Sequence, residues 1–289
     1  METSVAGTTS VTGLFGYPVQ HSLSPGMHNA AFRKLGLDYV YVPFNVHPDN
    51  LETAVRAIRS LGLVGVNLTI PHKEGVIPFL DWISEDALRI RSVNTIHNCD
   101  GTLKGYTTDG SGFIKALEAA GKPPKGSKAV VLGAGGSARA TVYTLALEGA
   151  DVTVANRTYS RAVELSRLID AALGSDAVRF AALDSPEARE AIREADLLVN
   201  CTSVGMYPHT EEQPVPAEWL HAGLFVYDQV YNPVETRLLE SARAVGARGA
   251  NGVGMLVFQG ALSFEIWTGR TPPLKVMEKA VLEGLAARR

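Results

Sequence analysis

A chain of 289 residues with 46% hydrophobic and 20% charged side chains has the composition of a globular protein and is long enough for two domains. Its net charge of −3 offers no basic surface for nucleic acid, and no apolar run reaches the length of a membrane span. Its two cysteines suggest neither a disulfide framework nor a metal site, so we expect a soluble cytoplasmic protein.

The first predicted helix begins within the segment Ser-Leu-Ser-Pro, residues 22–25. Ser24 is expected to cap this helix, with Pro25 as its first helical residue. An apolar stripe then runs through residues 26–35, and Gly36 ends the helix. Capping explains the presence of Ser24 but gives no structural role to the Ser22 hydroxyl. Two hydroxyls at a helix N-terminus also suit a small carboxylate, so the local sequence leaves both interpretations open.

A βαβ unit is predicted next. Residues 40–44 and 65–70 are apolar runs of strand length, whereas apolar residues recur at helical spacing over 51–61. Either Asp49 or Asn50 can cap that helix. Short strands that alternate with amphipathic helices are typical of a mostly parallel sheet, so we expect this half of the chain to be an α/β domain.

Polar side chains interrupt the second of these strands and the turn after it. Ligands of open α/β sheets gather at the carboxyl ends of strands, so Asn67, Thr69 and Lys73 could line a binding cleft. Lys73 could equally be an ordinary solvated loop lysine. His72 is expected to be a capping or packed residue without a catalytic role.

Two further polar residues lie at the ends of elements where this half of the chain finishes. They are Asn94 in Ser-Val-Asn-Thr and Asp109 in Gly-Tyr-Thr-Thr-Asp-Gly. Asp109 could simply cap the helix predicted from Ser111 or form part of the turn before it. Only the combination of an amide with a carboxylate makes this region a candidate site.

The polar, turn-rich residues 121–128 separate the two halves of the chain. After them, a strand, a Gly-rich turn, an Ala-rich helix and a second strand predict a nucleotide-binding half-fold. The strands expected there cover residues 129–132, 151–155, 196–201 and 224–229, and helical segments are expected over 255–267 and 274–287.

The Gly-rich turn matches the dinucleotide-binding fingerprint, with alanine at its third small position. Gly133 permits the tight turn, Gly135 lets the backbone approach a pyrophosphate, and Ala138 lets the helix pack on the strand. Free N–H groups at the helix start then face the anion. An ordinary Gly-rich turn is the alternative, but the flanking strands and helix favour a cofactor site at Gly133, Ala134, Gly135, Gly136, Ser137 and Ala138.

The residues after the second strand of this motif favour NADP over NAD. An NAD enzyme presents Asp or Glu there to the ribose hydroxyls, whereas this chain has Asn156, Arg157 and Thr158. Arg157 can pair with a 2′-phosphate, and its two neighbours can add hydrogen bonds. The alternative is a solvent-exposed arginine at the end of a strand.

Taken together, these segments resemble the shikimate dehydrogenase family over nearly the whole chain. The resemblance rests on several motifs that occur in order, beginning with Ser-Leu-Ser-Pro. Those in the second half are Asn-Cys-Thr-Ser-Val-Gly-Met at 200–206, Tyr-Asp-Gln-Val-Tyr-Asn-Pro at 227–233, Asn-Gly-Val-Gly-Met-Leu at 251–256 and Gln-Gly-Ala at 259–261.

The resemblance implies an enzyme with two α/β lobes. Residues 1–109, completed by 252–289, would form the substrate lobe, and residues 110–251 would form a Rossmann-like lobe that binds NADP. The implied reaction is the reversible NADPH-dependent reduction of 3-dehydroshikimate to shikimate, a step of the shikimate pathway toward chorismate and the aromatic amino acids. The implied partners are small molecules, and a homodimer is left open.

By the same analogy, Lys73 and Asp109 form an acid/base pair. An ammonium group beside the reacting oxygen stabilises the charge that hydride transfer builds there and supplies the proton, which suits Lys73. The residues implied to bind the substrate are Ser22 and Ser24 through its carboxylate, Asn67, Thr69, Asn94, Asp109 and Gln259 through its hydroxyls, and Tyr231, which would face the same cleft. The residues implied to lie along the cofactor are Thr202, Ser203, Met206, Gln229 and Gly252.

Two residues depart from the family pattern. Thr107 stands where relatives often have Asn, and Gln229 stands where an apolar residue is common near the cofactor. Neither belongs to the implied acid/base pair, but Gln229 is one of the residues implied to lie along the cofactor.

Two other functions remain as alternatives. A quinate or dual quinate/shikimate dehydrogenase would use the same residues, although Ser24, often Thr in quinate-preferring relatives, and Arg157 favour shikimate and NADP. A catalytically silent NADP-sensing module is the alternative from another class. The presence of Lys73 and Asp109 argues against it.

Overall fold

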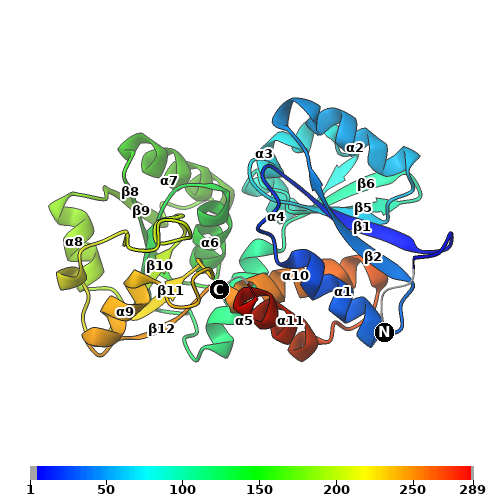
Figure 1. The fold of residues 1–289 in the computed structure, drawn as a ribbon. Coiled ribbons are helices and arrows are strands. Elements are labelled where there is room, and N and C mark those ends of the chain that lie inside the picture. The colour runs from blue at the N-terminus through cyan, green and yellow to red at the C-terminus, as the bar shows by residue number, and fades with distance from the viewer. Residues whose placement is uncertain (1–4, 288–289) are drawn as a thin grey trace. The chain divides into compact units, whose positions relative to one another are not determined.

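Two compact units make up residues 5–287, the part of the chain that the structure, a computed structural model, describes (Figure 1). Unit 1 comprises the residues up to Thr108 and those from Leu256 onward, and unit 2 comprises Asp109–Met255. Each is an α/β unit built on a six-stranded sheet, which confirms the predicted fold class. Which unit binds which ligand stays a prediction at this stage.

The sheet of unit 1 is mixed. Strand β1 lies between β2 and β3 and pairs with both in parallel, as the predicted βαβ unit requires. β5 is antiparallel to both of its neighbours, β3 and β6, which the sequence analysis did not foresee. In spatial order the strands are β2 (Tyr39–Asn45), β1 (Ser10–Gly16), β3 (Gly65–Leu68), β5 (Thr95–Cys99), β6 (Thr102–Tyr106) and β4 (Trp82–Ile83).

Helices cover this sheet because their apolar faces need burial. Val55 and Ile58 of α2 are fully buried and pack in one cluster with Val66 and Ile96 of the sheet. Helix α1 packs against α11. The helices of unit 1 are α1 (Ser24–Lys34), η1 (Pro48–Asn50), α2 (Leu51–Ser60), α3 (His72–Gly75), η2 (Ile77–Phe79), α4 (Glu85–Arg89) and α11 (Leu274–Ala286), and α10 (Val253–Thr268) crosses from unit 2 into unit 1.

The start of α1 differs from the prediction. Leu23, not Ser24, is the N-cap residue, and no side chain caps the helix. Ser24 is already helical, and its backbone N–H donates to Ser22 Oγ at 3.2 Å. Gly36 follows the helix with φ +63°, as predicted for a helix-ending glycine. The prediction that Ser24 caps α1 is therefore wrong, and its hydroxyl is not used by the helix end.

Two boundaries near β3 also differ. The predicted strand 65–70 ends at Leu68, because His72 N–H donates to Thr69 O and turns the chain into α3. Neither Asp49 nor Asn50 caps α2 with its side chain. The short helix η1 precedes α2 instead, and His47 accepts the N–H of Asp49 at its start.

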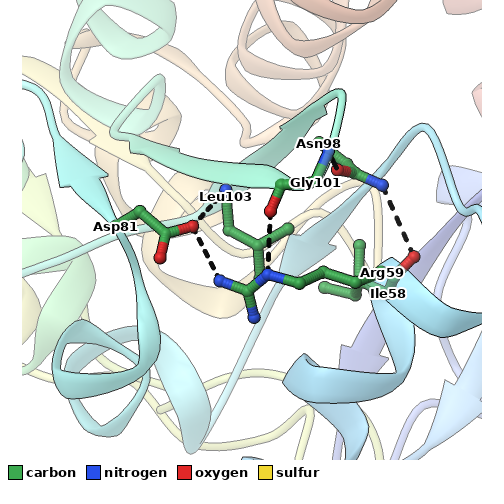
Figure 2. Close-up of polar contacts among 6 residues, drawn as sticks. All are labelled: Ile58, Arg59, Asp81, Asn98, Gly101 and Leu103. Atoms are coloured by element: carbon green, nitrogen blue, oxygen red, sulfur yellow. Dashed lines mark hydrogen bonds and ion pairs between the residues drawn. The ribbon is translucent and has the colours of Figure 1, made fainter.

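The β5–β6 hairpin is tied to neighbouring elements by polar contacts (Figure 2). Its two-residue turn, Asp100 and Gly101, has positive φ at both positions, as a tight Asp-Gly hairpin requires. Arg59 at the end of α2 donates to Gly101 O at 2.8 Å and to Asp81 Oδ2 at 2.7 Å. Asp81 also accepts Leu103 N–H at 2.6 Å, so one carboxylate joins α2, β6 and the segment before β4.

We expect Asp81→Asn to lower the free energy of unfolding at pH 7 by about 1–2 kcal/mol, because the carboxylate accepts both a guanidinium and a backbone N–H. These two donors, Leu103 N–H first and Arg59 second, hold the pKa of Asp81 below its usual value. The difference between wild type and variant should therefore be present above the ordinary carboxyl pKa and vanish as the pH falls through the lowered one. Urea unfolding at several pH values measures it.

Glu52→Gln is the matched control. It breaks an exposed i,i+4 ion pair with Arg56 that holds no backbone group, so the free energy of unfolding should change by less than about 0.5 kcal/mol. Equal losses in the two variants would contradict the role given to Asp81.

The sheet of unit 2 is parallel throughout. Its first strand in the chain, β7, lies at the centre between β8 and β10, which is the strand order of dinucleotide-binding folds. In spatial order the strands are β12 (Arg248–Ala250), β11 (Phe225–Asp228), β10 (Leu197–Asn200), β7 (Lys128–Leu132), β8 (Asp151–Asn156) and β9 (Val178–Ala182). The helices are α5 (Asp109–Ala119), α6 (Gly136–Leu147), α7 (Tyr159–Leu173), α8 (Pro186–Arg193), η3 (Ala217–Trp219) and α9 (Arg237–Ala244).

None of the helices within residues 5–287 combines the length and the apolar character needed to cross a membrane.

Candidate cofactor and substrate sites

The turn after β7 has the geometry that the fingerprint predicts. Gly133 has φ +108°, and a Cβ there would lie 3.1 Å from Thr202 Cγ2, so both the backbone and the space favour glycine. A Cβ at Gly135 would meet no atom within 4 Å, and no side chain caps the start of α6. Ala138 is fully buried against the sheet. The first N–H groups of α6 therefore lack intrahelical partners and suit a pyrophosphate.

The end of β8 carries the residues predicted to read a 2′-phosphate. Arg157 and Thr158 are exposed, and the Asn156 side chain donates to Thr158 O at 2.8 Å, which shapes the turn into α7. No carboxylate occupies positions 156–158. Arg161 is a further exposed arginine, in the first turn of α7, and its backbone N–H donates to Thr158 O.

A buried carboxylate holds the loops after β10 and β11 together. Asp228 is fully buried and accepts hydrogen bonds from Asn200 Nδ2 at 2.9 Å, Val230 N at 3.0 Å and Thr236 Oγ1 at 2.6 Å. Burial raises the pKa of Asp228, against the effect of these three donors. Asn200 Oδ1 in turn accepts the N–H and the hydroxyl of Thr202. Asn200 therefore fixes both the backbone and the side chain of Thr202, a predicted cofactor residue.

Gln229 bonds to the fingerprint helix. Its Oε1 hydrogen-bonds to Ser137 Oγ, and its Nε2 donates to Thr141 Oγ1 at 2.8 Å. Because both ends of the amide are held by α6, this polar departure from the family pattern ties the loop after β11 to the start of that helix. The structure brings together the predicted cofactor residues Ser137 and Gln229.

The remaining predicted residues of unit 2 lie on the loops that follow the carboxyl ends of β10, β11 and β12. A Cβ at Gly252 would lie 2.0 Å from Gln229 O, so this backbone approach requires glycine. Ser203 is exposed, and Met206 has 45% of its surface exposed. Tyr231 is half-buried on the loop after β11.

In unit 1, four of the predicted substrate residues belong to one group of polar side chains. Asn67 lies at the end of β3 and Asn94 immediately before β5, both nearly fully buried. Asn94 Nδ2 lies 3.3 Å from Gln259 Oε1 on α10, and Ser24 Oγ reaches Asn67 through the phenol of Tyr41.

Thr69 and Lys73 lie further along the same segment. Thr69 packs close to Gly16, where a Cβ would lie 2.3 Å from its methyl group. His72 is buried, with Nε2 2.8 Å from Val46 O, which agrees with the prediction of a packed residue. Lys73 is half-buried on α3, and its carbonyl accepts Val93 N–H at 2.8 Å. This bond anchors the backbone at Lys73 to the segment before β5.

Asp109 opens α5 and is 4% exposed. The residue before it, Thr108, donates its N–H to Asn94 Oδ1 at 2.9 Å. The Thr107 hydroxyl, at the other departure from the family pattern, is buried and has no hydrogen-bond partner within residues 5–287. The pairing of Lys73 with Asp109 stays a prediction, as do the substrate and cofactor roles above.

Three family models match successive segments of the chain. Residues 14–96 match the model of the shikimate dehydrogenase substrate binding domain, 116–217 that of shikimate / quinate 5-dehydrogenase, and 252–282 that of the shikimate 5′-dehydrogenase C-terminal domain. Shikimate dehydrogenase (NADP(+)) of Methanopyrus kandleri is 52% identical over 285 residues, with 98% of each chain covered.

Two solved structures with different activities are similar to this chain. Shikimate 5-dehydrogenase from Thermus thermophilus, in complex with NADP(H) and shikimate, has a TM-score of 0.88 at 39% identity, covering 96% of this chain and 100% of that one. Quinate dehydrogenase from Corynebacterium glutamicum, in complex with NAD, also has a TM-score of 0.88, at 32% identity, covering 95% of this chain and 99% of that one. The fold alone therefore does not separate the two activities.

Proposed function

This chain belongs to the shikimate dehydrogenase family, and on that premise we propose that it reversibly reduces 3-dehydroshikimate to shikimate with NADPH. The observation that carries the proposal is the uncapped start of α6 after Gly133, followed by Arg157 at the end of β8 without a carboxylate beside it. A helix start of this kind binds a pyrophosphate, and an arginine at that strand end pairs with a 2′-phosphate.

The residues that would hold NADP are those of the fingerprint, Gly133–Ala138, and the phosphate-reading Asn156, Arg157 and Thr158. When bound, the cofactor supplies the hydride to the ketone carbon. Thr202, Ser203, Met206, Gln229 and Gly252 would line the rest of its path. Gln229 is bonded to α6 and supports this site by holding the helix start in place.

We assign the acid/base work to Lys73 and Asp109. As the hydride reaches the carbonyl carbon, negative charge develops on the oxygen, and the Lys73 ammonium stabilises it and donates the proton that makes the hydroxyl. In the oxidation direction the amine takes the proton back. Asp109 orients Lys73 and binds the neighbouring hydroxyl.

Substrate binding is assigned to the hydroxyl and amide groups of unit 1. Ser22 and Ser24 would hold the carboxylate, and the ring hydroxyls would bind to Thr69, Asn94, Asp109 and Gln259, with Asn67 in the same group and Tyr231 facing it. Asn94 and Gln259 support this assignment because their amides are already bonded to one another and present fixed donors and acceptors.

The test is a steady-state assay of the purified protein with shikimate and quinate, each with NADP and NAD. The proposal expects the rate with shikimate and NADP to dominate. Comparable rates with quinate would move the assignment to a dual-specificity enzyme. No turnover in any of the four combinations, with NADP still bound, would replace it with a cofactor-sensing role.

Arg157→Ala is expected to weaken NADP binding about 10- to 100-fold and NAD binding by less than about twofold, because only NADP carries the 2′-phosphate that the guanidinium pairs with. Isothermal titration with each cofactor measures this. Arg167→Ala removes another exposed arginine of α7 as the control and should leave both affinities unchanged. Equal weakening of NADP and NAD by Arg157→Ala would disprove the 2′-phosphate role.

We further propose that the protein works in the cytoplasm, on small molecules alone, with no nucleic-acid or membrane partner and as a monomer or a homodimer. The near-neutral net charge of −3 supports this. Size-exclusion chromatography with light scattering distinguishes a monomer from a homodimer. Salt-sensitive binding to duplex DNA would contradict the absence of a nucleic-acid partner.

A further inference from the structure

Tyr41 of β2 is a fully buried residue that joins two candidate substrate residues. Its phenol oxygen lies 2.9 Å from Asn67 Oδ1, and the Ser24 side chain also hydrogen-bonds to it. The Tyr41 ring stacks on the His28 imidazole, with ring centroids 4.5 Å apart and planes 5° apart. Stacking therefore fixes the ring while the phenol connects α1 to β3.

The direction of these bonds follows from one carbonyl group. Asn67 Nδ2 lies 3.1 Å from the backbone oxygen of Asn94, which can only accept a hydrogen bond. The amide nitrogen must face Asn94, so Oδ1 faces Tyr41 and accepts its phenol hydrogen. The phenol has a single hydrogen and gives it to Asn67, so the Ser24 hydroxyl that bonds to the phenol oxygen must be a donor. Hydrogen is thus donated from Ser24 to Tyr41 and from Tyr41 to Asn67.

Asn67 has its hydrogen-bonding groups occupied by protein atoms. Its two amide hydrogens face three acceptors, Asn94 O at 3.1 Å, Thr95 Oγ1 at 3.1 Å and Ser263 Oγ at 2.9 Å. Within residues 5–287, Tyr41 is the one donor to Oδ1. Asn67 therefore holds Asn94, Thr95 and Ser263 through its amide hydrogens.

The hydrogen bonds from Ser24 through Tyr41, Asn67 and Thr95 form a series whose next residue is Asn94. Its Oδ1 accepts Thr95 Oγ1 at 3.0 Å and Thr108 N at 2.9 Å, which turns its Nδ2 toward Thr108 Oγ1 at 2.8 Å and Gln259 Oε1 at 3.3 Å. The bond to Gln259 is the longest of this series, so it is the one that a ligand hydroxyl can replace at the lowest cost.

We propose that Tyr41 is a positioning residue that acts through Asn67 and Thr95 to orient the Asn94 amide toward a hydroxylated ligand. The inference rests on the proposed function and sharpens it. Asn67 then orients Asn94 in addition to the ring-hydroxyl contact that the family resemblance implies for it.

Tyr41→Phe tests this by removing one hydroxyl and keeping the ring stacked. We expect the KM for shikimate to rise about tenfold, with kcat within about threefold and the Kd of NADP unchanged. Tyr39→Phe, on the same strand, is the matched control and should change none of the three values, because its ring packs on Phe32 outside the series. An unchanged KM in Tyr41→Phe overturns the proposal.

Ser263→Ala provides an internal check. The two amide hydrogens of Asn67 keep two of their three acceptors when the Ser263 hydroxyl is lost. The KM for shikimate should therefore change by less than about threefold. A loss as large as that of Tyr41→Phe would mean that general loosening of this buried group, and not the orientation of Asn67, limits binding.

Hydrogen exchange of side-chain amides, measured by NMR without substrate, separates this proposal from the proposed function. Exchange at Asn94 Nδ2 should be at least about tenfold faster in Tyr41→Phe than in wild type or Tyr39→Phe. If the wild type does not oxidise shikimate, the proposed function fails, and this exchange rate alone decides the role of Tyr41. Should Tyr41→Phe not fold, Asn67→Ala must give the same increase, and unchanged exchange overturns the inference.

Discussion

Replacement of Lys73 by alanine is expected to reduce kcat for shikimate oxidation about 10³-fold, because the ammonium both stabilises the developing oxyanion and supplies its proton. The Kd of NADP should stay within about twofold of wild type, since Lys73 lies in unit 1 and the fingerprint and Arg157 lie in unit 2. Pre-steady-state reduction of NADP measures the chemical step, and fluorescence titration measures the cofactor affinity.

Lys104→Ala is the matched control for this experiment. Lys104 is another half-buried lysine of unit 1, on β6, with no assigned role in the site. Its loss should leave kcat within about twofold of wild type. If Lys73→Ala weakens NADP binding as strongly as it lowers kcat, the assignment of Lys73 to the transition state is wrong.

Acidification from pH 7 to pH 4 is expected to lower the free energy of unfolding by about 3 kcal/mol through His28 alone. His28 is fully buried among aromatic rings, and neither ring nitrogen has a hydrogen-bond partner within residues 5–287. Burial lowers its pKa from 6.5 to about 3. The unfolded chain accepts a proton below pH 6.5 and the folded chain does not, so the stability present above pH 6.5 is lost as the pH falls toward 3.

Urea unfolding between pH 7.5 and pH 4 measures this slope. His28→Phe cannot take up the proton, so its unfolding free energy should depend less on pH by about 1.4 kcal/mol per unit below pH 6, whatever its stability at pH 7. Because wild type and variant share all other titratable groups, the comparison cancels the contributions of those groups to the pH dependence, including that of Asp228 with its raised pKa. His209→Gln removes an exposed histidine and should keep the wild-type slope. Identical slopes for wild type and His28→Phe would refute the prediction.

Unit 2 was the more predictable part of the fold. Its strands β7, β8, β10 and β11 are buried apolar runs and were predicted, and the predicted strand 151–155 ends one residue before the observed β8. The short or partly exposed strands β9 and β12 were not predicted. Unit 1 mixes parallel and antiparallel pairs, and β5 carries polar residues such as His97 and Asn98, so no strand was predicted there. The Asp100–Gly101 turn was the available signal, because Asp-Gly between alternating side chains predicts a hairpin.

The candidate site was predictable only where one residue carries its own signal. Gly133 and Arg157 are recognisable from their places in a motif. Tyr41 and Ser263 are not, because a tyrosine in a strand and a serine in a helix are unremarkable by themselves. Ser263 bonds to Asn67, which is 196 positions away in sequence, so this contact follows from the folded structure and not from any local pattern.

The division of unit 1 between two segments also determines when it can fold during synthesis. Residues 109–255 form unit 2 as one continuous segment, whereas β3 and β5 must wait for α10, whose Ser263 and Trp267 bond to Asn67 and to Ile96 O. At the usual rates of translation this wait lasts roughly 10 to 30 s. For that time a growing chain exposes the face of these strands that α10 covers. Unit 1 is therefore the part of the nascent protein that completes its fold last.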